Sequence, residues 1–99
     1  SFRRDFVQGT DPVEFVIDVP RGQYEVLVIS GDEIEDNVTI IETENGAKYG
    51  GECVKQGIYQ CELIPIVQKK DRPIRLRIST KPGYSWKINC LFLNTLKGY

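Results

Sequence analysis

Histidine, the side chain that most often moves protons or binds catalytic zinc, is absent from this 99-residue chain. Its absence removes the usual general base, the Ser-His nucleophile pair and most sets of catalytic zinc ligands. The chain has 14 aspartate and glutamate residues, but nothing in the sequence marks two of them as a general acid and a general base that act together. We therefore expect no catalytic residues, and we expect that the chain by itself is not an enzyme.

An acidic stretch, Asp32-Glu33-Ile34-Glu35-Asp36-Asn37, is the strongest candidate for a metal site. Its carboxylates could provide some of the oxygen ligands that Ca²⁺ takes. The stretch lacks the spacing of an EF-hand, however, and a run of charges between strands is usually a solvated connection. We therefore predict neither a metal ion nor a cofactor here, and calcium is the alternative.

The cysteines, Cys53, Cys61 and Cys90, are too few for a disulfide scaffold and lack the paired spacing of a zinc site. Cys53 and Cys61 lie symmetrically about Gly57, so in a hairpin they would face each other across two strands at a distance that suits a disulfide. Two outcomes remain open for this pair, a disulfide or two buried thiols. Cys90 is expected to lie in the core.

The elements that must position any site are strands. Two runs rich in Val, Ile, Phe and Tyr flank Pro20-Arg21-Gly22 and predict an antiparallel hairpin over residues 15–32. The first arm alternates apolar and polar residues, as a strand does when one of its faces is exposed to solvent. The second arm, Val26-Leu27-Val28-Ile29, is apolar on both faces and is therefore predicted to lie in the middle of a sheet.

Further strands are expected over residues 1–7, 37–43, 49–54, 58–64, 74–78 and 86–93. Asn45-Gly46 is a tight-turn signal after the second of these, and Lys55-Gln56-Gly57 would join the next two as another hairpin. No segment shows sustained helical periodicity. About seven or eight strands at this spacing predict an all-β fold, an antiparallel two-sheet β-sandwich or jelly roll.

Composition and charge describe one domain of ordinary globular character. The chain is 40% hydrophobic and 27% charged, and its net charge of -1 gives no general attraction to nucleic acid or to anionic membranes. No apolar run approaches the length of a membrane span. We expect a single domain over residues 1–99, cut from a larger protein, with no nucleic-acid or membrane partner.

Two stretches carry a pattern that is specific when both are taken together and in order. Residues 15–32 read F-x-I-D-V-P-x-G-x-Y-x-V-x-V-x-x-G-D, with Arg4-Asp5 before them, and residues 86–93 read W-K-I-N-C-L-F-L. The pattern resembles the galactose-binding-like β-sandwich modules appended to carbohydrate-active enzymes, notably those that precede rhamnogalacturonan acetylesterases and related pectin-degrading or glycoside-hydrolase domains. Such modules usually open with a segment that carries Asp-Phe-Gly and Gly-Tyr motifs, and residues 1–14 of this chain carry neither.

The resemblance implies a non-catalytic, secreted accessory module that binds a plant cell-wall or related polysaccharide and adjoins a catalytic domain in the same chain. Sugar recognition takes an aromatic face for the apolar side of the ring and planar polar groups for the hydroxyls. On that basis Tyr84 and Trp86, which follow a Pro-Gly turn, are expected to stack on a sugar. Asn89 and Arg4 are expected to contact hydroxyls, and Tyr49 is a second aromatic candidate.

Structural interpretations of these residues remain open. Strand parity places Trp86 on one face with Ile88 and Cys90, which suits a core residue, and an Asn in the position of Asn89 often satisfies backbone groups. The alternative function is a structural β-sandwich domain that packs against and orients a neighbouring catalytic domain without binding glycan. A ligand module should expose an aromatic ring with convergent polar groups in a concave patch, whereas a spacer should expose a flat apolar patch.

Overall fold

The computed structural model describes residues 2–3 and 7–98 of the chain. Strands form most of this part, their pairings are antiparallel, and none of its residues is helical. The prediction of an all-β, antiparallel fold is therefore confirmed. Among the residues described, no helix has the length and apolar character needed to cross a membrane.

The strands follow one another with short connections. They are β1 (Phe2–Arg3), β2 (Val7–Gly9), β3 (Val13–Ile17), β4 (Gly22–Gly31), β5 (Asn37–Thr43), β6 (Lys48–Val54), β7 (Tyr59–Gln68), β8 (Ile74–Ser79), β9 (Trp86–Ile88) and β10 (Cys90–Gly98).

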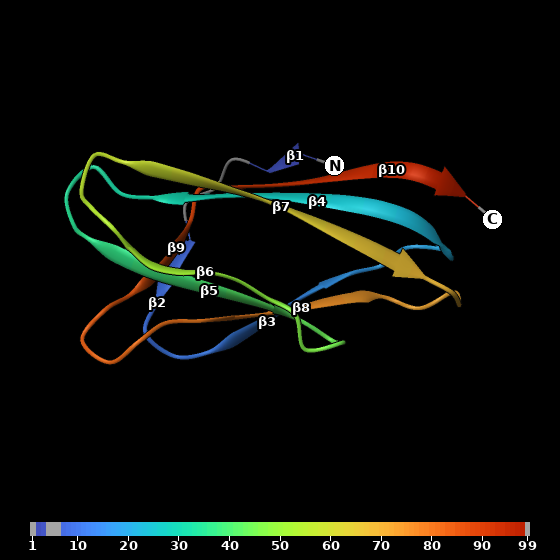
Figure 1. The fold of residues 1–99 in the computed structure, drawn as a ribbon, viewed down its shortest axis with the longest axis horizontal. Coiled ribbons are helices and arrows are strands. Elements are labelled where there is room, and N and C mark those ends of the chain that lie inside the picture. The colour runs from blue at the N-terminus through green and yellow to red at the C-terminus, as the bar shows by residue number, and fades with distance from the viewer. Residues whose placement is uncertain (1, 4–6, 99) are drawn as a thin grey trace.

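The chain folds as one antiparallel ribbon in which strands of the first half pair, in reverse order, with strands of the second half. β5 pairs with β6, and moving outward from that hairpin β4 pairs with β7, β3 with β8, β2 with β9 and β1 with β10. The ribbon bends over on itself. Its strands divide between a first sheet, in the order β1-β10-β4-β7, and a second sheet, in the order β3-β8-β5-β6. Figure 1 shows the two sheets as stacked layers, with β2 and β9 at one end.

The predicted hairpin over residues 15–32 is wrong as a hairpin, although both of its arms are strands. β3 lies in the second sheet and β4 in the first, so the two arms belong to different sheets and do not pair. Pro20 lacks a backbone N–H for a ladder between them, and its carbonyl accepts a hydrogen bond from the Tyr24 hydroxyl at 2.5 Å. The doubly apolar arm is confirmed as a central strand, because β4 lies between β10 and β7.

The second predicted hairpin is also wrong, and with it the expected pairing of two thiols. β6 belongs to the second sheet and β7 to the first, which sets Cys53 opposite Val38 and Cys61 opposite Ile29. The three cysteines all fall in the described part of the chain, and none of them forms a disulfide. Cys53 and Cys61 are exposed rather than buried, whereas Cys90 is buried as expected.

The tight turn predicted at Asn45-Gly46 is present between β5 and β6. Gly46 adopts a φ of 90°, which an L side chain rarely does. Its backbone N–H donates to the Thr43 carbonyl at 3.0 Å, and the Thr43 N–H donates to the Ala47 carbonyl at 2.9 Å. This turn is the closed end of the ribbon.

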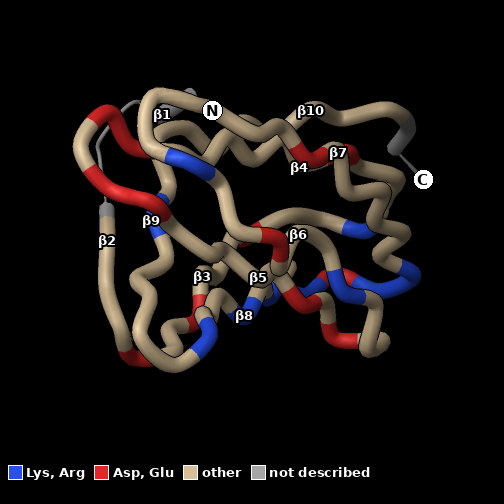
Figure 2. Tube along the Cα trace, turned by 60° about the vertical axis from the view of Figure 1, so that its left-hand side comes forward, with Lys and Arg blue, Asp and Glu red and all other residues tan. Residues whose placement is uncertain are grey.

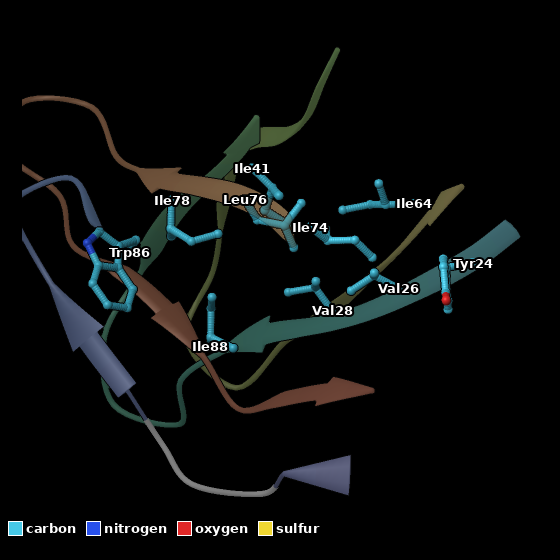
Figure 3. Packing of buried hydrophobic residues seen from close by; sticks show 10 residues of the cluster. All are labelled: Tyr24, Val26, Val28, Ile41, Ile64, Ile74, Leu76, Ile78, Trp86 and Ile88. Atoms are coloured by element: carbon cyan, nitrogen blue, oxygen red, sulfur yellow. The ribbon is translucent and has the colours of Figure 1, made fainter. Parts of the chain in front are cut away.

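The core lies between the inner faces of the two sheets. Figure 3 shows Val26 and Val28 of β4 pointing toward Leu76 and Ile78 of β8, and each of the four side chains is at most 1% exposed. Because side chains alternate along a strand, the same residues that bury one face of β8 leave its intervening arginines outside. Burial of these faces against each other is what holds the two sheets together.

Truncation of a core residue should therefore be far more costly than truncation of the same residue type on the surface. We expect Ile78→Ala to lower the free energy of unfolding by about 2–5 kcal/mol, since a buried isoleucine loses transfer energy and leaves a cavity. Ile34 is 77% exposed, so Ile34→Ala should change that free energy by less than about 0.5 kcal/mol. Urea denaturation of the two variants provides the comparison, and equal losses would contradict the inward face assigned to β8.

Candidate functional site

An open hollow lies beside the loop that joins β8 to β9. Its walls come from residues 80–85 of this loop and from Thr10 and Pro12 in the connection between β2 and β3, and it encloses about 400 Å³. The two segments meet because β2 pairs with β9 and β3 pairs with β8. The ribbon therefore brings together two loops that are some seventy residues apart in sequence.

A tight turn holds the backbone of Tyr84, the aromatic residue of this hollow. The Tyr84 backbone N–H donates to the Lys81 carbonyl at 3.1 Å. Pro82 and Gly83 occupy the two central positions, and Gly83 has a φ of 86°, which together are the signature of a type II turn. Tyr84 remains 39% exposed. The prediction that a Pro-Gly turn presents Tyr84 at the surface agrees with this geometry.

Polar residues line the same hollow as Tyr84. Thr80 lines the hollow, and its hydroxyl is shielded from solvent and has no hydrogen-bond partner among the residues described. A buried hydroxyl without a partner is costly, so a ligand hydroxyl or a water that bonded to it would be favoured. Thr10 and Lys81 add further polar side chains to the lining.

Trp86 does not present a ring face to this hollow, contrary to the stacking role expected for it. It is 3% exposed, and its ring lies edge-on to Phe15 with 6.5 Å between ring centroids and 84° between ring planes. The indole N–H donates to the Asp11 carbonyl at 2.8 Å. Strand parity turns Trp86 inward, where it anchors the segment that forms one wall of the hollow.

Gly9 makes room for that indole. It pairs with Trp86 between β2 and β9, and a Cβ placed on Gly9 would lie 2.8 Å from the Cζ2 atom of Trp86. A side chain at this position would push the ring or the strand away. The close approach of β2 to Trp86 thus depends on glycine.

Asn89 lies between β9 and β10, apart from the residues that line the hollow. Its side-chain amide donates to the Gly31 carbonyl at 2.7 Å, and its backbone N–H donates to the Ile29 carbonyl at 2.8 Å. Both bonds satisfy backbone acceptors at the end of β4. The structure therefore gives Asn89 a structural role where a hydroxyl contact was expected.

The other two candidates are not joined to the hollow either. Tyr49 is half-buried in β6 and lines a separate cleft of about 150 Å³ next to β7. Polar side chains of that cleft already have protein partners: Arg72 pairs with Glu44 at 3.7 Å, and the Gln68 amide donates to the Arg72 carbonyl at 2.9 Å. Arg4 lies outside the described residues.

The acidic loop between β4 and β5 directs its carboxylates to groups of the protein itself. Figure 2 shows its acidic residues gathered at one end of the molecule. The Lys87 ammonium forms an ion pair with Asp32 and lies 3.5 Å from an oxygen of Glu35. Lys87 is only 2% exposed, and burial lowers the pKa of its ammonium. The Lys87 ammonium therefore occupies the loop for which the sequence analysis kept a calcium ion as the alternative.

The remaining carboxylates of this loop are also occupied. Asp36 accepts a hydrogen bond from the Gln56 backbone N–H at 2.9 Å, which lowers the pKa of its carboxyl, as does the Lys55 ammonium at 3.4 Å. Glu33 accepts from the Tyr59 hydroxyl at 2.8 Å, and this bond raises the pKa of Tyr59. Across the described residues, no group of three or more acidic, cysteine or histidine side chains is arranged to hold a metal ion.

Sequence reasoning missed Thr10, Pro12 and Thr80 as parts of the hollow. Each stands in a connection between strands, and nothing local marks it as a ligand contact. The available signal was indirect. Gly9 lies in a short strand near the start of the chain and Trp86 is the first residue of β9, and a glycine leaves room for a tryptophan on the paired strand. Only the long-range pairing of β2 with β9 turns that signal into a site.

Comparison with known proteins found no family model, no curated protein and no solved structure that matches this chain.

The ion pair of Lys87 should make the acidic loop part of the stable fold. The side chains of Lys87 and Asp32 are 3% and 12% exposed, whereas that of Glu35 is 64% exposed. We expect Asp32→Asn to lower the free energy of unfolding by about 3–5 kcal/mol, because it leaves a buried ammonium without its main counter-charge.

Glu35→Gln is the matched control for this test. It removes an exposed partner of the same ammonium and should cost at most about 1 kcal/mol. Chemical denaturation at neutral pH measures both variants. Equal, small losses would show that Lys87 does not depend on Asp32.

Proposed function

We propose that this chain is a non-catalytic carbohydrate-binding accessory module whose site is the hollow beside Tyr84. The observation that carries the proposal is that Tyr84, whose backbone is held by a type II turn, is exposed in a hollow that Thr80 also lines, and that the shielded Thr80 hydroxyl lacks a partner among the described residues. An aromatic face with convergent hydroxyl-binding groups in a concave site is the arrangement that sugar rings fit.

The strand arrangement supports a jelly-roll fold for this module. Without the short β2 and β9, the ribbon pairs the first strand with the last, the second with the next to last, and so on inward to the hairpin. An antiparallel ribbon wrapped into two four-stranded sheets is the plan of jelly rolls, which lectin domains use. The galactose-binding-like pattern read from residues 15–32 and 86–93 fits this plan.

The chemistry of the hollow favours a neutral sugar surface as the ligand. Among the described residues that line it, Lys81 is the one that carries a charge, and the others are Thr10, Pro12, Thr80, Pro82, Gly83, Tyr84 and Ser85. A single ammonium gives little long-range attraction, so binding should persist at high salt. We propose a plant cell-wall or related polysaccharide as the target, in an extracellular setting, with the module serving a catalytic domain beside it.

The test is the loss of binding when the exposed ring is removed. We expect Tyr84→Ala to weaken binding of the best oligosaccharide by about tenfold, because a stacked ring contributes about 0.5–1.5 kcal/mol beyond the area it buries. Calorimetry of the variant against pectin, xylan, glucan and galactan oligosaccharides measures this.

Tyr49→Ala is the matched control, since it removes the same side chain from the separate cleft. Circular dichroism establishes that both variants keep the fold. Full affinity in Tyr84→Ala with a loss in Tyr49→Ala would place the site in the cleft. No binding of the unaltered protein to any of these glycans would favour the alternative of a structural module.

A further inference from the structure

A buried lysine lies against two carboxylates of the loop between β4 and β5. Of the buried residues that the structure describes, Lys87 is the one that carries a charge, and lysine is almost never fully buried without a partner. Its ammonium forms an ion pair with Asp32, whose side chain is 12% exposed, and an oxygen of Glu35 lies 3.5 Å from the same nitrogen. An amine and a carboxyl group are therefore held together in a shielded place, with a second carboxylate beside them.

Both members of the ion pair are held in fixed orientations. The Lys87 backbone N–H donates to the Thr39 hydroxyl at 3.0 Å, and that hydroxyl donates to the Lys87 carbonyl at 3.2 Å. Oδ1 of Asp32 accepts a hydrogen bond from the Ile34 backbone N–H at 3.0 Å, and Oδ2 of Asp32 pairs with the ammonium. The carboxyl group of Asp32 is thus presented to Nζ of Lys87 while one of its oxygens is fixed by the backbone.

We propose that Lys87 and Asp32 become joined by an intramolecular isopeptide bond, an amide between Nζ of Lys87 and Cγ of Asp32. The bond links β9, which pairs with β2, to the loop that follows β4 of the first sheet. The reaction is a condensation in which an ammonium and a carboxylate give one amide and one water molecule. It therefore needs no oxidant, reductant or co-reactant.

The groups around the pair provide each step of the condensation. One proton passes from Nζ to Oδ2 of Asp32, which leaves a neutral amine beside a neutral carboxylic acid. The amine lone pair forms the C–N bond with Cγ, and the Ile34 N–H stabilises the negative charge that develops on Oδ1. Glu35 takes a second proton from Nζ and gives it to Oδ2. The Cγ–Oδ2 bond then breaks, the C=O bond forms again at Oδ1, and water leaves.

Burial and contact favour the amide over the ion pair. In bulk water an ammonium and a carboxylate are both well solvated, and they do not condense. Burial lowers the pKa of the Lys87 ammonium, so the neutral amine is easier to reach. The amide also removes two charges from a shielded site, where each carries a desolvation penalty. Well-oriented intramolecular groups react as if their concentration were about 10⁵–10⁸ M, and such contact accelerates the step.

The isopeptide bond gives this fold a covalent cross-link. It closes a loop of chain that contains β5, β6, β7 and β8, and closing a long loop restricts the unfolded chain. The cysteines of the described part of the chain form no disulfide. An amide, unlike a disulfide, also resists reducing agents.

Mass spectrometry of the denatured protein tests the bond directly. After folding at neutral pH, the unaltered protein should weigh less than its sequence by the mass of one water molecule. Digestion should yield one product in which the peptide that contains Asp32 is joined to the peptide that contains Lys87. Trypsin should not cleave after Lys87, because the side chain of this residue no longer carries a charge.

Three variants identify the groups that take part, and circular dichroism establishes that each keeps the fold. Asp32→Ala should keep the full mass of its sequence. Glu35→Gln keeps the ion pair but lacks the proton carrier, so it should lose water at least about a hundredfold more slowly, and the converted variant carries the same amide. Glu33→Gln is the matched control, because that carboxylate accepts from the Tyr59 hydroxyl, and it should lose water at the rate of the unaltered protein. Cell-free synthesis sampled over time gives these rates.

The proposal is overturned if the folded, unaltered protein keeps the full mass of its sequence. Loss of water without a link between the peptides of Asp32 and Lys87 would overturn it as well, as would loss of water by Asp32→Ala at the unaltered rate. None of these outcomes bears on the sugar site, because the residues that line the hollow beside Tyr84 do not take part in the condensation.

Discussion

The structure depends on the burial of two apolar sheet faces against each other. Val26 and Val28 of β4 meet Leu76 and Ile78 of β8 inside one core, and these side chains are almost completely shielded from water. Apart from the hairpin of β5 and β6, strands of the two large sheets that are neighbours in sequence lie on opposite sides of the core. This constraint explains why β3 and β4, and likewise β6 and β7, do not pair with each other, and why the connections between them cross from sheet to sheet.

Strand identity could be predicted from the sequence, but strand partners could not. Alternation in residues 74–78 indicated a strand and its inner face, and the doubly apolar run at 26–29 indicated a central strand, because both patterns are local properties of the sequence. The turn at Asn45-Gly46 was likewise predictable from its residues. The symmetric placement of Cys53 and Cys61 about a glycine led to the wrong partner, because a glycine turn joins two sheets as readily as it joins two paired strands.

The residues of the candidate site likewise divide into those that could be predicted from the sequence and those that could not. Tyr84 was predictable, since its exposure follows from a turn four residues long that contains proline and glycine. Trp86 and Asn89 were assigned to the ligand from the resemblance, yet one is an anchor inside the core and the other bonds to backbone carbonyls. Thr10, Pro12 and Thr80 lay beyond sequence reasoning because long-range pairing assembles them. A side chain that a local turn presents can be recognised from the sequence, whereas a site built from loops that are distant in the sequence cannot.

The nested pairing of the strands also determines the order in which the molecule can fold. The hairpin of β5 and β6 closes over a few residues, whereas β1 and β10 meet only after about ninety residues of chain have been brought together. Each pair of strands that forms shortens the loop that the next pair must close. The strand pairs should therefore form in order, from the turn between β5 and β6 outward. The first and last strands join late, and β10 must have left the ribosome before the first sheet can be completed.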